Sequence, residues 1–409
     1  MEMTTMETDE TMVAFIEALQ EFNTSDILSD YSEDAKSLAI PNRKQEDWKY
    51  TNASFLKKQN WDAETKGNLE GFMNHWLGEN SGVLVFENGE INPALSTALT
   101  ANTYSVNTTT QTLDWRSETE VFSQLNAGFK KGHHITIPAK TVLDQPIYVV
   151  EFGNAGTPIL NSLKVSLGAF AEAKVVIVSG SFHPDHFNNH FGHFDVATNA
   201  KLNVERLQIH EAGKEIASEN VYMADNCQFH MNTLTLAGSW VRNNLNIHIK
   251  GENSFAGLNG VYLLNGTQHV DNHTMVDHTV PHCESSELYK GIAHDSSTAV
   301  FNGKVFVRKD AQKTNAFQQN ANILMSPDAT VNSKPELEIY ADDVKCSHGS
   351  TTGQFDEEAV FYLRSRGIGE KSARELLVQA FAGDVLDTIT VESVREKTGH
   401  YLGEKFAWN

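Results

Sequence analysis

The first part of the chain carries two apolar patterns with helical spacing and one short apolar run. Positions i, i+3, i+4 and i+7 of the first pattern are Met12, Phe15, Ile16 and Leu19, which predicts a helix with one apolar face. A second helix is predicted at Phe72–Leu77. The apolar run at 83–86 is followed by Asn88-Gly89, a pair typical of tight hairpin turns. We therefore expect residues 1–130 to form a domain that mixes helices and strands.

From about Gly132 the helical periodicity stops, and short β-rich runs recur between polar turns. Four runs begin with a polar residue, a small residue, any residue and an apolar one. Their small residues, Ala173, Ala200, Cys227 and Ser254, are each 27 positions apart. Less regular copies follow at 298–301 and 328–331. A fixed period of this length predicts a solenoid in which each unit buries its apolar face on the next.

Strand-rich units of this length favour a parallel β-helix over residues 131–350, so we expect a mainly β fold. An antiparallel sandwich is the alternative, but its turns come about every 8–12 residues without a longer repeat. The polar-small start of each unit is interpreted as a tight corner. Cys227 then fills a structural corner position that Ala or Ser takes in the other units.

Helical signals return at the end of the chain, in residues 351–409. Acidic residues 356–358 suit the first turn of a helix, and Gly367 stops that helix. The next helix is predicted to end at Gly383 and to carry an apolar stripe: Ala373, Leu376, Leu377, Ala380 and Phe381. A helical domain this small needs a partner surface or the end of the sheet to bury its stripe.

Composition excludes several function classes. The 409 residues include 53 acidic and 32 basic side chains, and the net charge of −21 argues against nucleic acid or an anionic membrane as partner. Three widely spaced cysteines argue against a disulfide framework and fit a reducing compartment. The start, Met1–Glu7, has no apolar run, and no apolar stretch approaches the ~20 residues that span a bilayer. We therefore expect a cytoplasmic protein.

The best candidate for chemistry is Cys346 with His348. On an extended strand these two side chains point to the same face, and a thiolate beside an imidazole can hold iron, zinc or a sulfur intermediate. Asp342 and Asp343 lie just upstream. The alternative is packing, because Val344 shares the same phase and cysteine is a small core residue. One Cys-x-His pair is too small a ligand set for a stable cluster or zinc site of its own.

Other candidate sites are ambiguous. The loop Pro41–Asn52 offers charges for a phosphate or partner site, but it also fits a capped turn anchored by Trp48 and Tyr50. Two histidine clusters, at 183–193 and 269–282, have spacings that can bind a transition metal. The alternative for them is a loop and a set of strand-edge or interface histidines.

A polar stretch near residue 312 adds two further expectations. Asn302-Gly303 is a turn signal that precedes a strand at 305–307. The amides that follow form ladders between coils or lie in solvent: Gln312, Gln318, Gln319, Asn320 and Asn322.

Several stretches resemble one protein family. The stretch "ADDVKCSHGSTTGQFDEEAVFYLRSRGI" resembles the C-terminal signature of the SufB/SufD family of the SUF iron–sulfur cluster assembly system, in its SufD form. The residues 41–51, "QHVDNHTMVDH", "SSELYKGI" and the "AQKT" stretch resemble other parts of the family, so matches run from Pro41 to about Asp387. The sibling SufB reads closer to "EHEATTS" where this chain has Cys346–Thr352. Ser350 departs from the family pattern, where alanine is expected.

The resemblance implies a right-handed parallel β-helix core between an N-terminal α/β domain and a C-terminal helical domain. It implies a non-catalytic scaffold that pairs with SufB along the β-helix. The ATPase SufC would dock on the terminal helices, through Leu376, Leu377 and Phe381. Cys346 and His348 match the positions credited with holding a nascent cluster or iron, transiently and shared with SufB. No tightly bound cofactor is expected, and the isolated chain could form a homodimer.

Three alternatives remain at this point. The chain could be a SufB-like scaffold subunit. It could be an enzyme, either a β-helix polysaccharide lyase or a metal-dependent hydrolase that uses the histidines. It could also be a purely structural scaffold in which Cys346 is inert.

Overall fold

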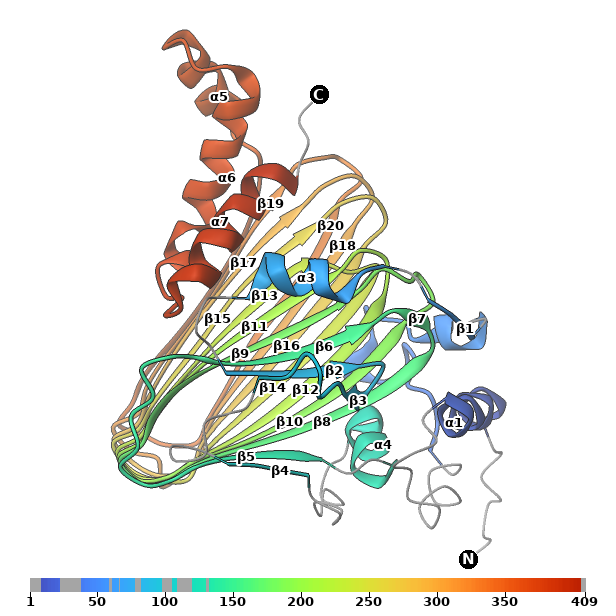
Figure 1. The fold of residues 1–409 in the computed structure, drawn as a ribbon. Helices are drawn as coiled ribbons and strands as arrows, with labels where there is room; N and C mark the ends of the chain where they lie inside the picture. Colours follow the sequence, from blue (N-terminus) through green and yellow to red (C-terminus); the bar gives the residue numbers. More distant parts are fainter. Residues whose placement is uncertain are drawn as a thin grey trace, which may run out of the picture.

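The structure is a computed structural model that describes residues 9–22, 38–58, 61–65, 67–77, 82–97, 105–108, 120–129 and 132–405. Its centre is a long parallel β-solenoid, with α5–α7 along one side and the N-terminal elements around the other end (Figure 1). The expected class, mainly β with an N-terminal α/β region and C-terminal helices, is confirmed. The acidic start at Met1–Glu7 lies outside the described residues.

Two sheets form the walls of the solenoid, and from β8 onward consecutive strands alternate between them. In spatial order the nine-stranded sheet contains β4 (Ser105–Thr108), β5 (His133–Ile137), β8 (Pro158–Leu167), β10 (Phe187–Val196), β12 (Lys214–Met223), β14 (Trp240–Ile249), β16 (His269–His278), β18 (Thr298–Val307) and β20 (Thr330–Ile339). The ten-stranded sheet contains β3 (Glu90–Ile91), β2 (Gly82–Glu87), β6 (Ile147–Gly153), β9 (Glu172–Ser181), β11 (Lys201–His210), β13 (Gln228–Ala237), β15 (Phe255–Leu264), β17 (Glu284–Ala293), β19 (Asn315–Leu324) and β21 (Lys345–Gln354). Outside these sheets, β1 (Asp62–Thr65) pairs with β7 (Ala155–Gly156).

The 27-residue repeat identifies one corner of the solenoid, with one error. Ala200, Cys227 and Ser254 occupy equivalent places, because each carbonyl accepts from the first residue of the next strand in the sheet. Ala173 does not belong to this column. It lies inside β9, opposite Leu202, and Ala171 takes the corner place. The copies at 298–301 and 328–331 are also wrong, since the first lies in β18 and the second spans the start of β20, both in the other sheet.

The polar residue of the repeat has a conformational cause. Asn199, Asn226 and Asn253 have φ of 59°, 55° and 56°, in the left-handed region that asparagine tolerates better than most residues. The equivalent residues of irregular coils are also left-handed: Lys140, Phe170, His282 and Lys313. The corner geometry is therefore common to all these coils, although asparagine marks it in only three of them.

The N-terminal elements cover the outer face of the nine-stranded sheet. They are α1 (Glu10–Phe22), the 3-10 turns Glu46–Trp48 and Ser54–Lys58, and α4 (Val121–Phe129). Phe15 of α1 and Trp48 join one apolar cluster with Phe187 and Trp240 of the sheet. Trp48 anchors its loop as predicted, with the Arg242 guanidinium 4.0 Å from the ring centroid. Tyr50 does not, because it is 40% exposed.

The ten-stranded sheet is covered by α3 (Leu69–Trp76), α6 (Glu370–Leu386) and α7 (Glu392–Lys405), while α5 (Glu357–Ser365) extends away (Figure 1). Gly383 does not end α6, which continues to Leu386 because the helix still has apolar sheet to cover. The α6–α7 turn is fixed by Glu205 of β11, whose Oε1 accepts from the Thr390 backbone N–H at 2.8 Å. No described helix is long and apolar enough to cross a membrane.

Candidate functional site

Cys346 and His348 lie on β21, the last strand of the ten-stranded sheet. Backbone register places them beside Ala316 and Gln318 of β19, which are buried inside the solenoid. The expectation that both side chains share a face is therefore confirmed, and that face is the inner one, at the open end of the coil stack. His348 is exposed and Cys346 is half-buried.

The Cys346 thiol has the surroundings of a core residue in the isolated chain. It packs at the edge of a small apolar cluster that includes Val305, Val307 and Ala316. Burial raises the pKa of Cys346, and a backbone hydrogen bond to Ala316 offsets this only in part. The thiol is therefore mostly protonated at neutral pH here, and a thiolate ligand requires a metal ion or another positive group beside it.

Asp343, one of the two acidic residues upstream, pairs with a neighbouring coil and not with the site. The carboxylate of Asp343 pairs with the ammonium group of Lys313, and the Asp343 carbonyl accepts from the Lys313 backbone N–H at 2.6 Å. The Asp343 N–H donates to Gln312 Oε1 at 2.9 Å. Asp343 thus fixes the last corner of the solenoid. Because its negative charge is paired with Lys313, it repels a Cys346 thiolate less than a free carboxylate would.

Amide side chains line the inside of the coils below this site. Gln318, Asn320 and Asn322 of β19 are buried, whereas Gln319 between them is exposed. Asn320 accepts from Ser333 of β20 at 2.8 Å, and Ser350 donates to that serine at 2.8 Å. The inward-facing amides are therefore buried, but they form no ladder of amides: their bonds to other coils join Gln318 to Glu287 and Asn320 to Tyr262. Through Ser333 these contacts reach the open end at Ser350.

Asn302-Gly303 is not a turn. Both residues lie within β18, so this sequence-based prediction is wrong. The glycine is needed for packing: a Cβ at Gly303 would lie 2.1 Å from Nε2 of Gln318 on the facing sheet. The interior amide occupies the place of the missing side chain.

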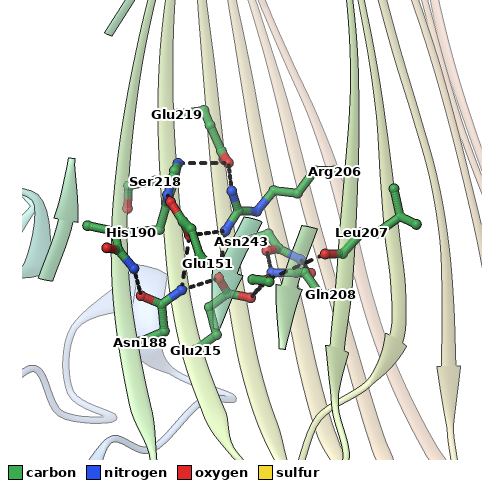
Figure 2. A network of polar contacts seen from close by, with 12 residues as sticks. Glu151, Asn188, His190, Arg206, Leu207, Gln208, Glu215, Ser218, Glu219 and Asn243 are labelled. Carbon is green, nitrogen blue, oxygen red and sulfur yellow. Dashed lines mark hydrogen bonds and ion pairs between the residues drawn. The ribbon is translucent and has the colours of Figure 1, made fainter. Parts of the chain in front are cut away.

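A second polar cluster fills the first coils (Figure 2). Arg206 has no exposed surface, and its Nη2 lies 2.6 Å from Glu215 Oε1. Burial alone would raise the pKa of Glu215, but the Arg206 charge and nearby histidines hold it well below its usual range. His190 Nδ1 lies 2.7 Å from Glu151, and burial raises the pKa of Glu219. The cluster is an internal ion network with no opening among the described residues that line it.

The first histidine cluster is divided by the strand geometry. His186 and His190 point into the solenoid, and His193 pairs with Asp195 on the outer face. Burial lowers the pKa of His186 to about 3, so it is neutral. His183 Nε2 lies 3.6 Å from Asp62, with Glu64 nearby. However, its Nδ1 accepts from the Asp185 N–H at 3.1 Å, which places the ring proton on Nε2 and leaves no lone pair for a metal ion.

The second cluster is equally dispersed. His269 and His273 lie against the N-terminal loop, where His273 pairs with Asp271 at 3.0 Å. His278 is inside the solenoid, 2.9 Å from Ser285, and His282 occupies a corner with φ of 60°. Neither set of four histidines therefore comes together in the described part of the chain.

The predicted docking residues of α6 have different surroundings. Leu376 is 47% exposed, but Leu377 and Phe381 are half-buried. Lys290 lies 5.0 Å from the centroid of the Phe381 ring. The most exposed apolar side chains of the helical region, Phe361 and Tyr362 of α5, were not among the predicted docking residues; they are 73% and 58% exposed. Both residues are apolar in the sequence, but the sequence does not show that α5 lies away from the sheet.

Comparison with known proteins gives consistent matches over this architecture. Residues 151–381 match the family model described as "SUF system FeS cluster assembly, SufBD core domain". The chain is 32% identical over 381 residues to the iron-sulfur cluster assembly protein SufD of Escherichia coli, which covers 90% of this chain and 89% of that protein. It is 32% identical over 390 residues to a SufBD family protein of Synechocystis, covering 88% of this chain and 86% of that protein.

A SufBD family protein of Mycobacterium leprae is 31% identical over 295 residues, which cover 68% of this chain and 72% of that protein. The family model spans more than half of the chain, including the interior amides, β21 and most of α6. The chain therefore belongs to the SufBD family of the SUF iron–sulfur cluster assembly system, in its SufD form.

Proposed function

We propose that this chain is a scaffold subunit on which a nascent iron–sulfur cluster is held, at an interface with SufB, while the SufC ATPase drives the assembly cycle. The observation that carries the proposal is the position of Cys346 and His348. They share the inner face of the last strand, at the open end of the solenoid. Two ligands fall short of the about four that a cluster usually takes from protein, so the others come from a second chain.

The open end also favours a partner of the same architecture. Within the described residues β20 pairs only with β18, and β21 pairs only with β19, so both leave an edge without a strand neighbour. Such edges pair readily with strands of another chain. A second solenoid, that of SufB, supplies matching edges and brings its own ligands to Cys346 and His348. A homodimer of the isolated chain would use the same edges.

SufC docking is proposed for the C-terminal helices. The inner face of α6 packs against the sheet through buried Val378, Ala382 and Val385. The exposed apolar surface is formed by Leu376 together with Phe361 and Tyr362. The ATPase site belongs to SufC in this proposal. The iron or cluster is cargo, and a weak shared site suits a product that must be released. We place the process in the cytoplasm, where free thiols such as those of this chain stay reduced.

The test is to make Cys346→Ser and His348→Ala separately, and together, in the three-subunit complex. The complex should form as in the wild type, because both side chains lie at the end of the core and His348 is exposed. Iron and sulfide recovered with the complex from cells should fall, most for the double variant. Cys227→Ser is the matched control, since that thiol is buried at a corner and burial raises its pKa to about 11.

Normal cluster content in both site variants would reject the scaffold role of the pair. The remaining interpretation would then be packing, which the apolar contacts of Cys346 with the end of the core already favour in the isolated chain.

A further inference from the structure

The column of inward-facing residues beneath His348 continues with two buried polar side chains. Register places His348 beside Gln318 of β19, and Gln318 beside Glu287 of β17. Neighbouring strands of a sheet are about 4.8 Å apart, so consecutive side chains of the column stack along the solenoid axis. Gln318 and Glu287 are 3% and 4% exposed, whereas His348 is exposed at the open end.

The orientation of the Gln318 amide is fixed from two sides. Its Nε2 donates to Glu287 Oε2 at 2.8 Å, and Glu287 Oε1 accepts from Thr274 at 2.5 Å. The same nitrogen occupies the space over Gly303, where a Cβ would lie 2.1 Å away. The amide nitrogen therefore faces Glu287 and Gly303, and the amide oxygen lies on the opposite side.

The Gln318 oxygen is consequently directed away from Glu287. It is buried, and it has no hydrogen-bond partner among the described residues. A buried acceptor left without a partner is destabilising, although the rest of this side chain is held in place. The residue on the far side of Gln318 in the column is His348.

We propose that Gln318 is a positioning residue for His348: once a partner covers the last coil, Gln318 Oε1 accepts a hydrogen bond from one ring N–H of His348. The lone pair of the other ring nitrogen is then free for a divalent cation such as Fe²⁺, beside the Cys346 thiol. This inference rests on the proposed scaffold function. Its chemistry is general, because a metal-binding histidine usually donates its second N–H to an acceptor that sets its tautomer and orientation.

Glu287 and Gly303 have supporting roles in this arrangement. Glu287 accepts a hydrogen bond from the amide nitrogen, and Gly303 provides the space in which that nitrogen lies. The glycine within β18 and the carboxyl group deep in the solenoid are thus linked to the terminal histidine by a single chain of contacts.

The test uses the three-subunit complex, kept anaerobic and titrated with Co²⁺ as a spectroscopic probe of a Cys/His site. Gln318→Leu removes the acceptor and should weaken Co²⁺ binding by about 10- to 100-fold. The matched control is Gln319→Leu, at an exposed position of the same strand, which should leave binding unchanged. The swap Glu287→Gln with Gln318→Glu keeps one amide and one carboxyl group and restores an acceptor below His348, so it should recover wild-type affinity.

A second readout separates positioning from stability. With ¹⁵N-labelled histidine, the ring nitrogens of His348 should show one tautomer in the wild-type complex and a mixture in Gln318→Leu. Wild-type Co²⁺ binding by Gln318→Leu, or no recovery in the swap, overturns the inference. If Gln318→Leu fails to assemble, the swap alone decides. If Cys346→Ser and His348→Ala bind Co²⁺ normally, the proposed function itself fails, which is a different outcome.

Discussion

Arg206 shows what a buried charge does in this solenoid. Its side chain has no exposed surface, and its Nη1 and Nη2 lie 3.3 Å from Glu219 and 2.6 Å from Glu215. Arg206→Met keeps much of the volume but removes the guanidinium partner of buried Glu215 and Glu219. We expect the free energy of unfolding to fall by about 3–5 kcal/mol, measured by denaturant titration.

Arg308→Met is the matched control for this prediction. Arg308 also pairs with a carboxylate, 2.7 Å from Asp277, but its side chain is 47% exposed. Water screens that pair, so the loss should be about 0–1 kcal/mol. Equal losses in the two variants would show that the internal network is not held by the Arg206 charge.

Glu287 gives the chain a specific dependence on pH. Burial raises the pKa of Glu287 to about 7, from a usual 4.5, although Thr274 and Gln318 donate to it. The folded protein therefore keeps a proton that the unfolded chain loses between these two values. The stability that this proton contributes is complete below pH 4.5 and is lost as pH rises through 7.

Glu287→Gln removes this titration while retaining bonds to both neighbours, since a glutamine amide can donate to Thr274 and accept from Gln318. The stability of the variant relative to the wild type should rise between pH 5 and pH 8, with a slope of at most about 1.4 kcal/mol per unit. Unfolding titrations across this range measure it. Parallel profiles for the two proteins would mean that Glu287 is already ionised at pH 5.

Single residues differ in how well the sequence predicted them. Alternation along a strand was enough to place Cys346 and His348 on one face, and the repeat was enough to place Cys227 at a corner. Gly303 and Gln318 could not be predicted in the same way. Their roles depend on the register between strands and on the facing sheet, and an Asn-Gly pair carries a turn signal whatever its surroundings are.

At the scale of elements, the corner column explains both the success and the error of the repeat analysis. Two neighbouring intervals, between Ala200, Cys227 and Ser254, are 27 residues long and carry asparagine at the left-handed position. The interval from Ala171 to Ala200 is longer, and Phe170 replaces the asparagine. The alanine at 173 lies at the right spacing by coincidence. The elements that cover the sheets were predicted as helices. Which face of α6 is buried was not predicted, because apolar residues lie on several of its faces.

At Phe170 a substitution is expected to increase the stability of the corner. It has φ of 61° and is 55% exposed, so a bulky side chain adopts a left-handed conformation with little burial in return. Phe170→Asn should raise the free energy of unfolding by about 0.5–1 kcal/mol, because asparagine tolerates this conformation. The reverse change at the regular corner, Asn226→Phe, should lower it by about 1–2 kcal/mol. A loss in the first variant would show that the exposed ring makes contacts that outweigh the backbone strain.

At the scale of the whole molecule, the resemblance and the repeat together predicted the three regions and their order. The sequence could not show how the N-terminal region joins the core: β2 pairs in parallel with β6, so that region extends the ten-stranded sheet itself. N-terminal elements cover the nine-stranded sheet, α3 and the C-terminal helices cover the ten-stranded sheet, and among the described residues no strand pairs with the outer edges of β20 and β21. This arrangement separates the proposed surfaces for SufB and SufC.

The separation makes SufC docking testable without disturbing the fold. Deleting the residues after Gly353 should abolish SufC binding and spare SufB pairing, but it would also uncover apolar sheet residues such as Val178, Leu234 and Ile292. Phe361→Asp is a sharper change, because that ring is 73% exposed on α5 and supports no part of the core. An exposed aromatic at the centre of an interface often contributes about 2 kcal/mol or more, so SufC affinity should fall by more than about tenfold.

Phe170→Asp is the control, since that phenylalanine is also exposed but belongs to a corner of the solenoid. It should leave SufC affinity unchanged, as measured by calorimetry with the SufB-bound chain. Wild-type affinity in Phe361→Asp would remove α5 from the docking surface. Leu376→Asp would then decide whether SufC uses the outer side of α6, where Leu376 is the exposed member of the predicted set. If both variants bind normally, the exposed apolar side chains of these helices serve another partner, and ATP hydrolysis reaches the β20–β21 end by a different route.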